Sequence, residues 1–177
     1  IPASYALRLW NKCIQLGKDF TITPYGTEAM HVLRAEKGYI IVGQETDGSV
    51  TPVDLDMNWI VSKKKYDFIG KRALIRSDTV KEDRKQLVGI LTVDPTIVLE
   101  EGSQLVEVET SLPMPMVGHI TSSYYSPNLG RSIALALVKS GTKKKGVKLI
   151  VPTLNKSVEV EITNPVFIDP QNERLLA

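Results

Sequence analysis

The sequence predicts an α+β fold, in which a helical first part is followed by a small antiparallel β-barrel. Two observations carry this prediction. Residues 4–37 contain two amphipathic patterns with helical spacing. Beyond residue 84 the chain changes to six short β-rich runs separated by turn-forming glycines and prolines. With 177 residues, of which 42% are hydrophobic and 24% charged, the chain can build one sizeable core or two small ones.

The first predicted helix follows Ser4, a residue type that is favourable as an N-cap. Leu7, Trp10 and Ile14 then share one face at helical spacing. Cys13 lies beside this face, so we expect its thiol to belong to the core.

The second predicted helix begins at Thr23 and Pro24, which serve as cap and first helical residue. It runs to about Lys37 and is stopped by Gly38. The apolar, β-branched run from Tyr39 to Gln44 follows directly and predicts a buried strand.

The middle of the chain is expected to be irregular. A turn and a basic run cover residues 51–65, and Tyr66 to Leu74 reads as the start of a further helix with Asp67 as its cap. The charged stretch 78–85 has little apolar surface and predicts a linker. We therefore predict a domain boundary near residue 84.

The predicted barrel contains six strands. In the last one, Val158, Val160 and Ile162 alternate with polar residues, which is typical of a strand with one solvent-exposed face. Turn residues at the ends of the runs favour a closed or partly closed antiparallel barrel. The predicted strands span residues 87–93, 104–109, 116–123, 131–139, 147–151 and 156–162.

Composition excludes several kinds of site. A formal net charge of +2 is too small to indicate nucleic-acid binding, and the lysines 143–145 lie between glycines as in a solvated turn. Cys13 is the only cysteine, which excludes an internal disulfide and fits a reducing, cytoplasmic compartment. No apolar run approaches the about 20 residues of a membrane span. His31 and His119 stand far apart, so we expect structural roles, no metal site and no catalytic residue in this chain.

Arg34 is the most informative single residue. It lies near the end of the second predicted helix, where a guanidinium can hold an anionic group through two parallel hydrogen bonds. The alternative is structural: Arg34 caps helix carbonyls or pairs with Glu28 or Glu36.

Two long motifs indicate a family. Leu33-Arg34-Ala35-Glu36-Lys37-Gly38, with the Thr51-Pro52 turn, resembles a motif block of the glycine-cleavage aminomethyltransferase (T-protein) family. The run from Gly118 to Val138 is similar to a second signature of that family. The resemblance implies a partial α/β folate-binding domain over residues 1–84, followed by a carboxyl-terminal β-barrel over residues 85–177.

The stretch 25–52 resembles more specifically the alpha subunits of heterotetrameric sarcosine oxidases. The resemblance implies a carboxyl-terminal part of a longer subunit, with the pterin-binding carboxylate and the catalytic aspartate of the family upstream of Ile1. It also implies oxidative demethylation of sarcosine to glycine in the whole enzyme, with tetrahydrofolate as acceptor and with FAD, FMN and NAD elsewhere. The implied partners are the other subunits and the preceding part of the alpha subunit. We expect the chain alone to be inactive and to bind folate weakly.

The resemblance implies three folate-binding residues. Arg34 takes the place of the family arginine that contacts folate. Trp59 would line the same pocket, or else belong to the core. Tyr124 would reach the pocket from the barrel, although adjacent tyrosines such as Tyr124 and Tyr125 more often cover a surface.

Three other interpretations remain open at this point. A stand-alone aminomethyltransferase shares all the motifs. Residues 37–45 resemble a motif of a folate-dependent protein of iron–sulfur maintenance. The cysteine of that motif is absent here, and the spacing between the matching residues is longer. The third is a non-catalytic module that packs against partner subunits.

Overall fold

The computed structural model describes residues 1–154, 156–174 and 176. The chain divides into two compact units, residues 1–30 and 31–177. The boundary near residue 84 stays a prediction.

The first unit is helical. It contains the 3-10 helices η1 (Ala3–Tyr5) and η2 (Gly17–Phe20) around α1 (Ala6–Leu16). Every residue of α1 is at least partly exposed, including Trp10 at 55%. The placement of Cys13 in a core is therefore wrong: its helix forms as predicted, but the face beside it is not covered in this structure.

Helix α2 (Thr27–Glu36) ends as its sequence predicts. Gly38 has a φ of +69°, and the N–H of Tyr39 donates to the carbonyl oxygen of Arg34 at 2.9 Å, the long bond of a Schellman motif. A Cβ on Gly38 would lie 2.6 Å from the carbonyl oxygen of Pro165. Glycine is thus required both by the turn and by the close approach of the carboxyl-terminal segment.

The strand predicted for residues 39–44 is absent, and this prediction was wrong. The chain turns at Gly43, whose φ is +99°, and only an isolated bridge joins Val42 to Thr46. The N–H groups of Gln44 and Glu45 both donate to the carbonyl oxygen of Ile41 at 3.2 Å. The turn brings the side chains of residues 44 and 45 inward, so polar contacts override the β propensity of the run.

Residues 46–84 contain short 3-10 helices instead of the predicted longer helix. These are η3 (Asn58–Ile60) and η4 (Lys71–Ile75). Asp67 does not cap η4, because Gly70 occupies the position before it and Asp67 accepts a hydrogen bond from the N–H of Phe68. Arg84, in the predicted linker, is tied to buried Asp54 at 2.6 Å.

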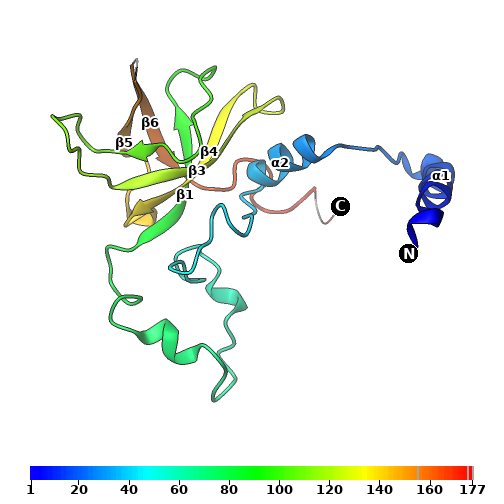
Figure 1. Ribbon diagram of the computed structural model, residues 1–177, viewed down its shortest axis with the longest axis horizontal. Coiled ribbons are helices and arrows are strands. Elements are labelled where there is room, and N and C mark those ends of the chain that lie inside the picture. Colours follow the sequence, from blue (N-terminus) through cyan, green and yellow to red (C-terminus); the bar gives the residue numbers. More distant parts are fainter. Residues whose placement is uncertain (155, 175, 177) are drawn as a thin grey trace. The chain divides into compact units, whose positions relative to one another are not determined.

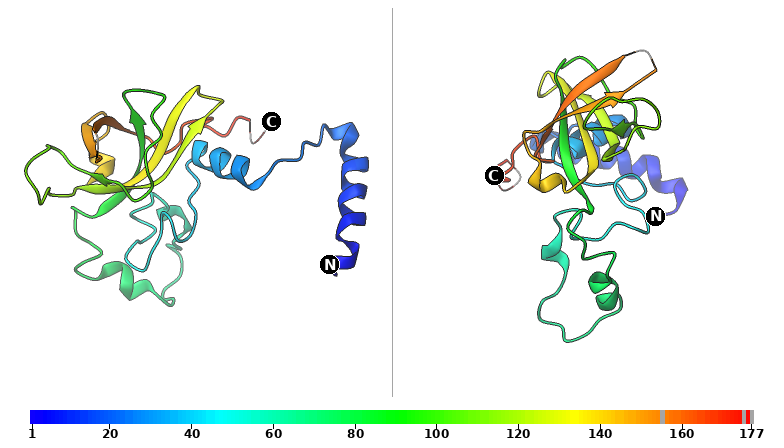
Figure 2. Two further views of the ribbon diagram at one scale, coloured as in Figure 1. Left: turned by 45° about the horizontal axis from the view of Figure 1, so that its top comes forward. Right: turned by 90° about the vertical axis from the view of Figure 1, so that its left-hand side faces the viewer.

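All six strands of the predicted barrel are present and form one antiparallel sheet in the order β2-β3-β4-β1-β6-β5 (Figure 1). Figure 2 shows this sheet from two further sides, curving around its interior. The edge strands β2 and β5 are joined by an isolated bridge between Val106 and Ile150, with both hydrogen bonds at 2.9 Å. The barrel is therefore only partly closed. The strands are β1 (Lys85–Thr92), β2 (Gln104–Leu105), β3 (Gly118–Ser126), β4 (Arg131–Lys139), β5 (Lys148–Pro152) and β6 (Ser157–Thr163).

The main core fills the interior of this sheet. It includes Ile90, Ile120 and Leu149, all fully buried. A second cluster on the outer side of β1 and β4 joins Leu87 and Leu135 to apolar side chains of the 40–57 segment. The central strands are thus buried on both faces, and the outer cluster holds the segment that follows α2 against the barrel.

Candidate functional site

Arg34 lies in the last turn of α2 with its side chain only 9% exposed. Its Nη2 donates to the Oε1 of Gln44 at 2.9 Å and to the Oγ of Ser122 at 2.6 Å. Its Nη1 donates to the carbonyl oxygen of Tyr39 at 3.2 Å and to Glu45. One guanidinium therefore joins the helix, the turn that follows it and strand β3.

Glu45 is the counter-charge of Arg34. Its Oε2 lies 3.1 Å from Nη1 of Arg34, and its side chain is fully buried. The N–H of Ile41 donates to the same oxygen at 2.7 Å, and the hydroxyl groups of Thr121 and Ser122 donate to Oε1. This set of donors satisfies the carboxylate, as a buried charge requires. The alternative partners expected for Arg34, Glu28 and Glu36, do not pair with it in the described contacts.

The structure places Tyr124 in contact with Arg34, as expected if the two residues belong to one site. Nη2 of Arg34 donates to the phenolic oxygen of Tyr124 at 3.2 Å. The guanidinium carbon lies 5.5 Å from the ring centroid, within the range of a cation–π contact. His31 meets the ring edge-on at a centroid distance of 6.3 Å. Two of the three predicted site residues thus share one cluster.

Trp59 is placed elsewhere. It lies in η3 with its side chain 78% exposed. The described contacts of Arg34 and Tyr124 do not include it.

The role of Glu36 was not predicted from the sequence. Its buried carboxylate accepts from the Oγ of Ser126 at 2.6 Å and from the Nδ2 of Asn128 at 2.9 and 3.1 Å. Its carbonyl oxygen accepts from the N–H groups of Phe167 and Ile168. Glu36 therefore ties the end of α2 to the β3–β4 turn and to the carboxyl-terminal segment. The available signal was the position of Glu36 and Asn128 within the two family motifs.

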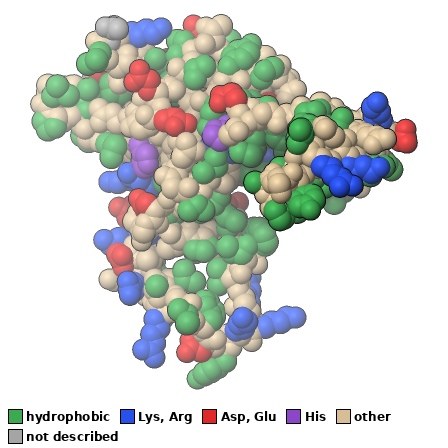
Figure 3. Space-filling model, turned by 45° about the vertical axis from the view of Figure 1, so that its right-hand side comes forward, with side chains coloured by type: hydrophobic (Ala, Val, Ile, Leu, Met, Phe, Trp, Pro, Cys, Tyr) green, Lys and Arg blue, Asp and Glu red, His purple; other side chains and the backbone are tan. Residues whose placement is uncertain are grey.

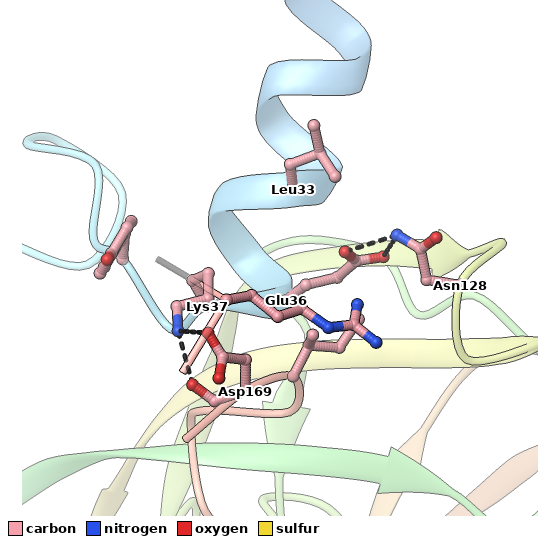
Figure 4. Close-up of a pocket in the computed structure, with 8 residues that line it drawn as sticks. Leu33, Glu36, Lys37, Asn128 and Asp169 are labelled. Carbon is pink, nitrogen blue, oxygen red and sulfur yellow. Dashed lines mark hydrogen bonds and ion pairs between the residues drawn. The ribbon is translucent and has the colours of Figure 1, made fainter. Parts of the chain in front are cut away.

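A pocket of about 340 Å³ opens beside this turn (Figure 4). Apolar side chains and charged side chains of both signs line this pocket. Figure 4 shows Glu36 turned toward Asn128 on one side, and Lys37 bonded to Asp169 on the other. The lining residues are Leu33, Glu36, Lys37, Tyr39, Asn128, Ile168, Asp169 and Arg174.

The charged side chains of this pocket differ in whether they already have an ion-pair partner. Burial would raise the pKa of Asp169, but hydrogen bonds from the N–H of Arg174 and from Lys37 outweigh it and hold that pKa below its ordinary value. Asp169 is therefore ionised at neutral pH and neutralises Lys37, at an Nζ to Oδ2 distance of 3.3 Å. The side chain of Arg174 is exposed, and no ion pair with it is found among the described residues. Arg174 is the cation that an anionic ligand in this pocket would meet.

The lining carries two cations, Lys37 and Arg174, and two carboxylates, Glu36 and Asp169, beside apolar side chains. Arginine, amide and carboxylate groups flank an apolar wall, as in many ligand pockets. Within the described ranges, no group of three or more candidate metal ligands occurs, and no helix has the length and apolar character needed to cross a bilayer.

Comparison with known protein families gives two matches. Residues 1–65 match the GCVT N-terminal domain, and residues 85–169 match the glycine cleavage T-protein C-terminal barrel domain. The fold resembles the crystal structure of glycine cleavage system aminomethyltransferase T from Bartonella henselae, with a TM-score of 0.78 and 23% identity over 95% of this chain and 45% of that chain. At this identity the likeness concerns the fold alone.

Curated relatives are closer in sequence. The sarcosine oxidase subunit alpha of Corynebacterium sp. (strain P-1) is 51% identical and that of Rhizobium meliloti 39%, over 98% and 99% of this chain but only 18% of each subunit. The aminomethyltransferase of Thermoanaerobacter pseudethanolicus is 30% identical over 94% of this chain and 44% of that protein. The chain thus spans about a fifth of the length of the sarcosine oxidase subunits that it matches. It is a homologue of the sarcosine oxidase alpha subunits, and its two parts match the two domain models of the glycine cleavage T-proteins.

Proposed function

We propose that this chain is the carboxyl-terminal part of a sarcosine oxidase alpha subunit and supplies part of its tetrahydrofolate site. The whole enzyme would oxidise sarcosine to glycine, and the one-carbon unit released would pass to the folate. The higher identity to the oxidase subunits, 39–51% against 30–32% for aminomethyltransferases, favours this over a stand-alone aminomethyltransferase.

The observation that carries the proposal is the hydrogen bond from Arg34 to Tyr124, together with the pocket that close neighbours of Arg34 in the chain line (Figure 4). Glu36 and Tyr39, which flank Arg34 in the helix end and the following turn, both line that pocket. The buried network around Arg34 therefore fixes the pocket wall, and Tyr124 from the barrel is part of the same network.

A folate carries an anionic glutamate tail, a benzoyl ring and a flat pteridine. We assign the tail to Arg174, because Glu45 already neutralises Arg34. Arg34 retains a supporting role at the site, since it orients Tyr124. Its Nε is buried and finds no acceptor among the described residues, so the network keeps one donor that a ligand-induced shift could satisfy.

The remaining pocket residues would orient the ligand. Leu33 and Tyr39 offer apolar and aromatic surface for the benzoyl ring, and Asn128 offers an amide whose orientation is fixed by Glu36. Trp59 does not line this pocket; it is kept as a proposed aromatic contact because of its position in the family resemblance, and its side chain is exposed.

The oxidative step is assigned to other parts of the enzyme. FAD, FMN and NAD would bind there, and no contact to them is assigned to residues of this chain. The proposed partners are the other subunits and the rest of the alpha subunit. A cytoplasmic location is proposed on the support of the single cysteine.

The test uses the full-length alpha subunit in its assembled enzyme, with tetrahydrofolate binding followed by calorimetry. Arg174→Gln removes an exposed cation, so folding should be unaffected, and a lost charged hydrogen bond should weaken binding about tenfold. Arg8→Gln removes an exposed arginine outside the pocket and serves as the matched control. Equal affinities for both variants and the wild type would contradict the assignment of Arg174.

A further inference from the structure

Lys37 uses its full hydrogen-bonding capacity within the protein. Its Nζ donates to the carbonyl oxygen of Asp169 at 2.6 Å, to the Oδ1 of Asn172 at 2.9 Å and to the Oδ2 of Asp169 at 3.3 Å. A lysine ammonium group has three N–H donors. The side chain of Lys37 is only 19% exposed. Lys37 lines the pocket of Figure 4, but none of its donors remains for a ligand there.

The three acceptors of Lys37 belong to one tight turn. The N–H of Asn172 donates to the carbonyl oxygen of Asp169 at 3.1 Å. Both residues have a positive φ, +50° for Asp169 and +59° for Asn172. Beside glycine, aspartate and asparagine are the residues that adopt this conformation most readily. The ammonium group of Lys37 therefore joins the first and the last residue of the turn.

Arg174 follows this turn in the chain. Its backbone N–H and that of Glu173 donate to the carboxylate of Asp169, which also accepts from Lys37. The guanidinium of Arg174 offers five donors, and its side chain is exposed at the pocket. The two cations of the pocket thus differ in role, because Lys37 is engaged by the protein whereas Arg174 can meet an anion.

The end of α2 fixes the carboxyl-terminal segment residue by residue. The carbonyl oxygen of Glu36 accepts from the N–H groups of residues 167 and 168, and Lys37 holds the turn 169–172 that comes next. Beyond this turn, no hydrogen bond to the end of α2 is found in the part of the chain that the structure describes. The position of Arg174 therefore depends on the turn that Lys37 holds.

We propose that Lys37 is the positioning residue of Arg174. Through Asp169 and Asn172 it fixes the backbone from which the Arg174 side chain meets the anionic tail of the ligand. This inference rests on the proposed function, which names that ligand as tetrahydrofolate. The alternative is that Lys37 binds the tail itself, but it would then give up one of the hydrogen bonds that hold the turn.

The first test needs no ligand. Hydrogen exchange of the full-length alpha subunit in its assembled enzyme, followed by mass spectrometry, measures the protection of the N–H groups of residues 173 and 174. Lys37→Met should raise their exchange rate about tenfold, because Asp169 is no longer held. Asp169→Asn keeps a residue type that suits the turn, and it should also raise the rate, because one amide oxygen cannot serve all the donors. Unchanged exchange in either variant would overturn the proposal.

The second test is a double-mutant cycle on tetrahydrofolate affinity, measured by calorimetry on the same assembled enzyme. Lys37→Met alone should weaken binding about tenfold, as Arg174→Gln does. In the Arg174→Gln variant, Lys37→Met should cause no further loss, because the cation that Lys37 positions is already gone. Additive losses, about hundredfold for the double variant, would overturn the proposal, since Lys37 would then contact the ligand or act only on the stability of the fold.

The matched control is Lys81→Met, the same substitution at an exposed lysine outside the pocket. Figure 3 shows Lys and Arg side chains at many places on the molecule, so general attraction of an anion does not depend on one of them. Lys81→Met should keep the exchange and the affinity of the wild type, and an equal loss in this variant would overturn the proposal. A wild type that binds no tetrahydrofolate would contradict the proposed function, while the exchange rates would still decide whether Lys37 positions Arg174.

Discussion

Arg34 and Glu45 form a buried ion pair, with Nη1 and Oε2 3.1 Å apart and exposed fractions of 9% and 0%. The pair joins the last turn of α2 to the turn after it, and its remaining hydrogen bonds reach Ser122 and Tyr124 on strand β3. The residue that sequence alone favours as a ligand-binding cation is therefore also a structural cross-link between helix and barrel.

Removal of either partner of this pair should destabilise the chain strongly. Arg34→Met leaves the Glu45 carboxylate buried without a counter-charge, which typically costs about 3–5 kcal/mol. The double variant Arg34→Met, Glu45→Met should cost less than the single one, because no uncompensated charge remains. Urea denaturation followed by circular dichroism measures each change.

The control for these single and double variants is the exposed pair Lys148 and Glu159, whose side chains are 63% and 48% exposed. Replacement of both by methionine should leave the urea midpoint close to that of the wild type, because exposed pairs contribute little. If Arg34→Met behaves like this control, the pair does not hold helix and barrel together.

The sequence predicted the barrel well because strand signals are local. Strand β4 was predicted as residues 131–139, and the structure has Arg131–Lys139. In β6 the predicted alternation of Val158, Val160 and Ile162 is confirmed by their burial. Strand β2 was predicted longer than it is, since after Leu105 only the bridge at Val106 continues the pairing.

The site could be predicted only in part, because its contacts are not local. Arg34 was identified from its motif, but its pairing with Glu45 depends on a turn at Gly43 where the apolar run predicted a strand. The contact between Glu36 and Ser126 joins residues that are 90 positions apart. A contact between residues so far apart produces no hydrophobic periodicity in the sequence. The family motifs mark both residues but do not show that they touch.

Stability should fall in acid through Asp54. Burial would raise the pKa of Asp54, but hydrogen bonds from Arg84 and Thr51 outweigh it and hold this pKa below its ordinary value of 3.8. The folded state therefore binds the proton less readily than the unfolded state does, so the stabilisation is complete above pH about 5 and is lost as the pH falls below 4. Asp54→Asn should flatten this part of the stability profile.

The measurement is urea denaturation of the wild type and of Asp54→Asn between pH about 3 and 7. The exposed Asp67→Asn serves as control and should follow the wild-type slope, because Asp67 has no cationic partner among the described ion pairs. A wild-type slope in Asp54→Asn would show that the pair with Arg84 does not drive the acid sensitivity.

Gly38 should tolerate no side chain. Its φ of +69° alone makes alanine unfavourable by about 1–2 kcal/mol. In addition, a Cβ would meet the carbonyl oxygen of Pro165 at 2.6 Å. Gly43→Ala isolates the first effect, because Gly43 also has a positive φ but nothing within 4 Å of its Cβ position. Thermal unfolding should therefore show a larger fall in Tm for Gly38→Ala, and equal falls would exclude the clash with Pro165.

The chain by itself should bind tetrahydrofolate only weakly. Glu45 neutralises Arg34 and Asp169 neutralises Lys37, so the tail carboxylates meet only Arg174 as an unpaired cation of the described pocket. The pocket is open, and the chain spans less than half of the aminomethyltransferases that it matches. Isothermal titration of residues 1–177 should give a Kd no tighter than about 1 mM, equivalent to about −4 kcal/mol. A micromolar Kd for this chain, abolished by Arg174→Gln, would mean instead that the pocket beside Arg34 is a sufficient folate site.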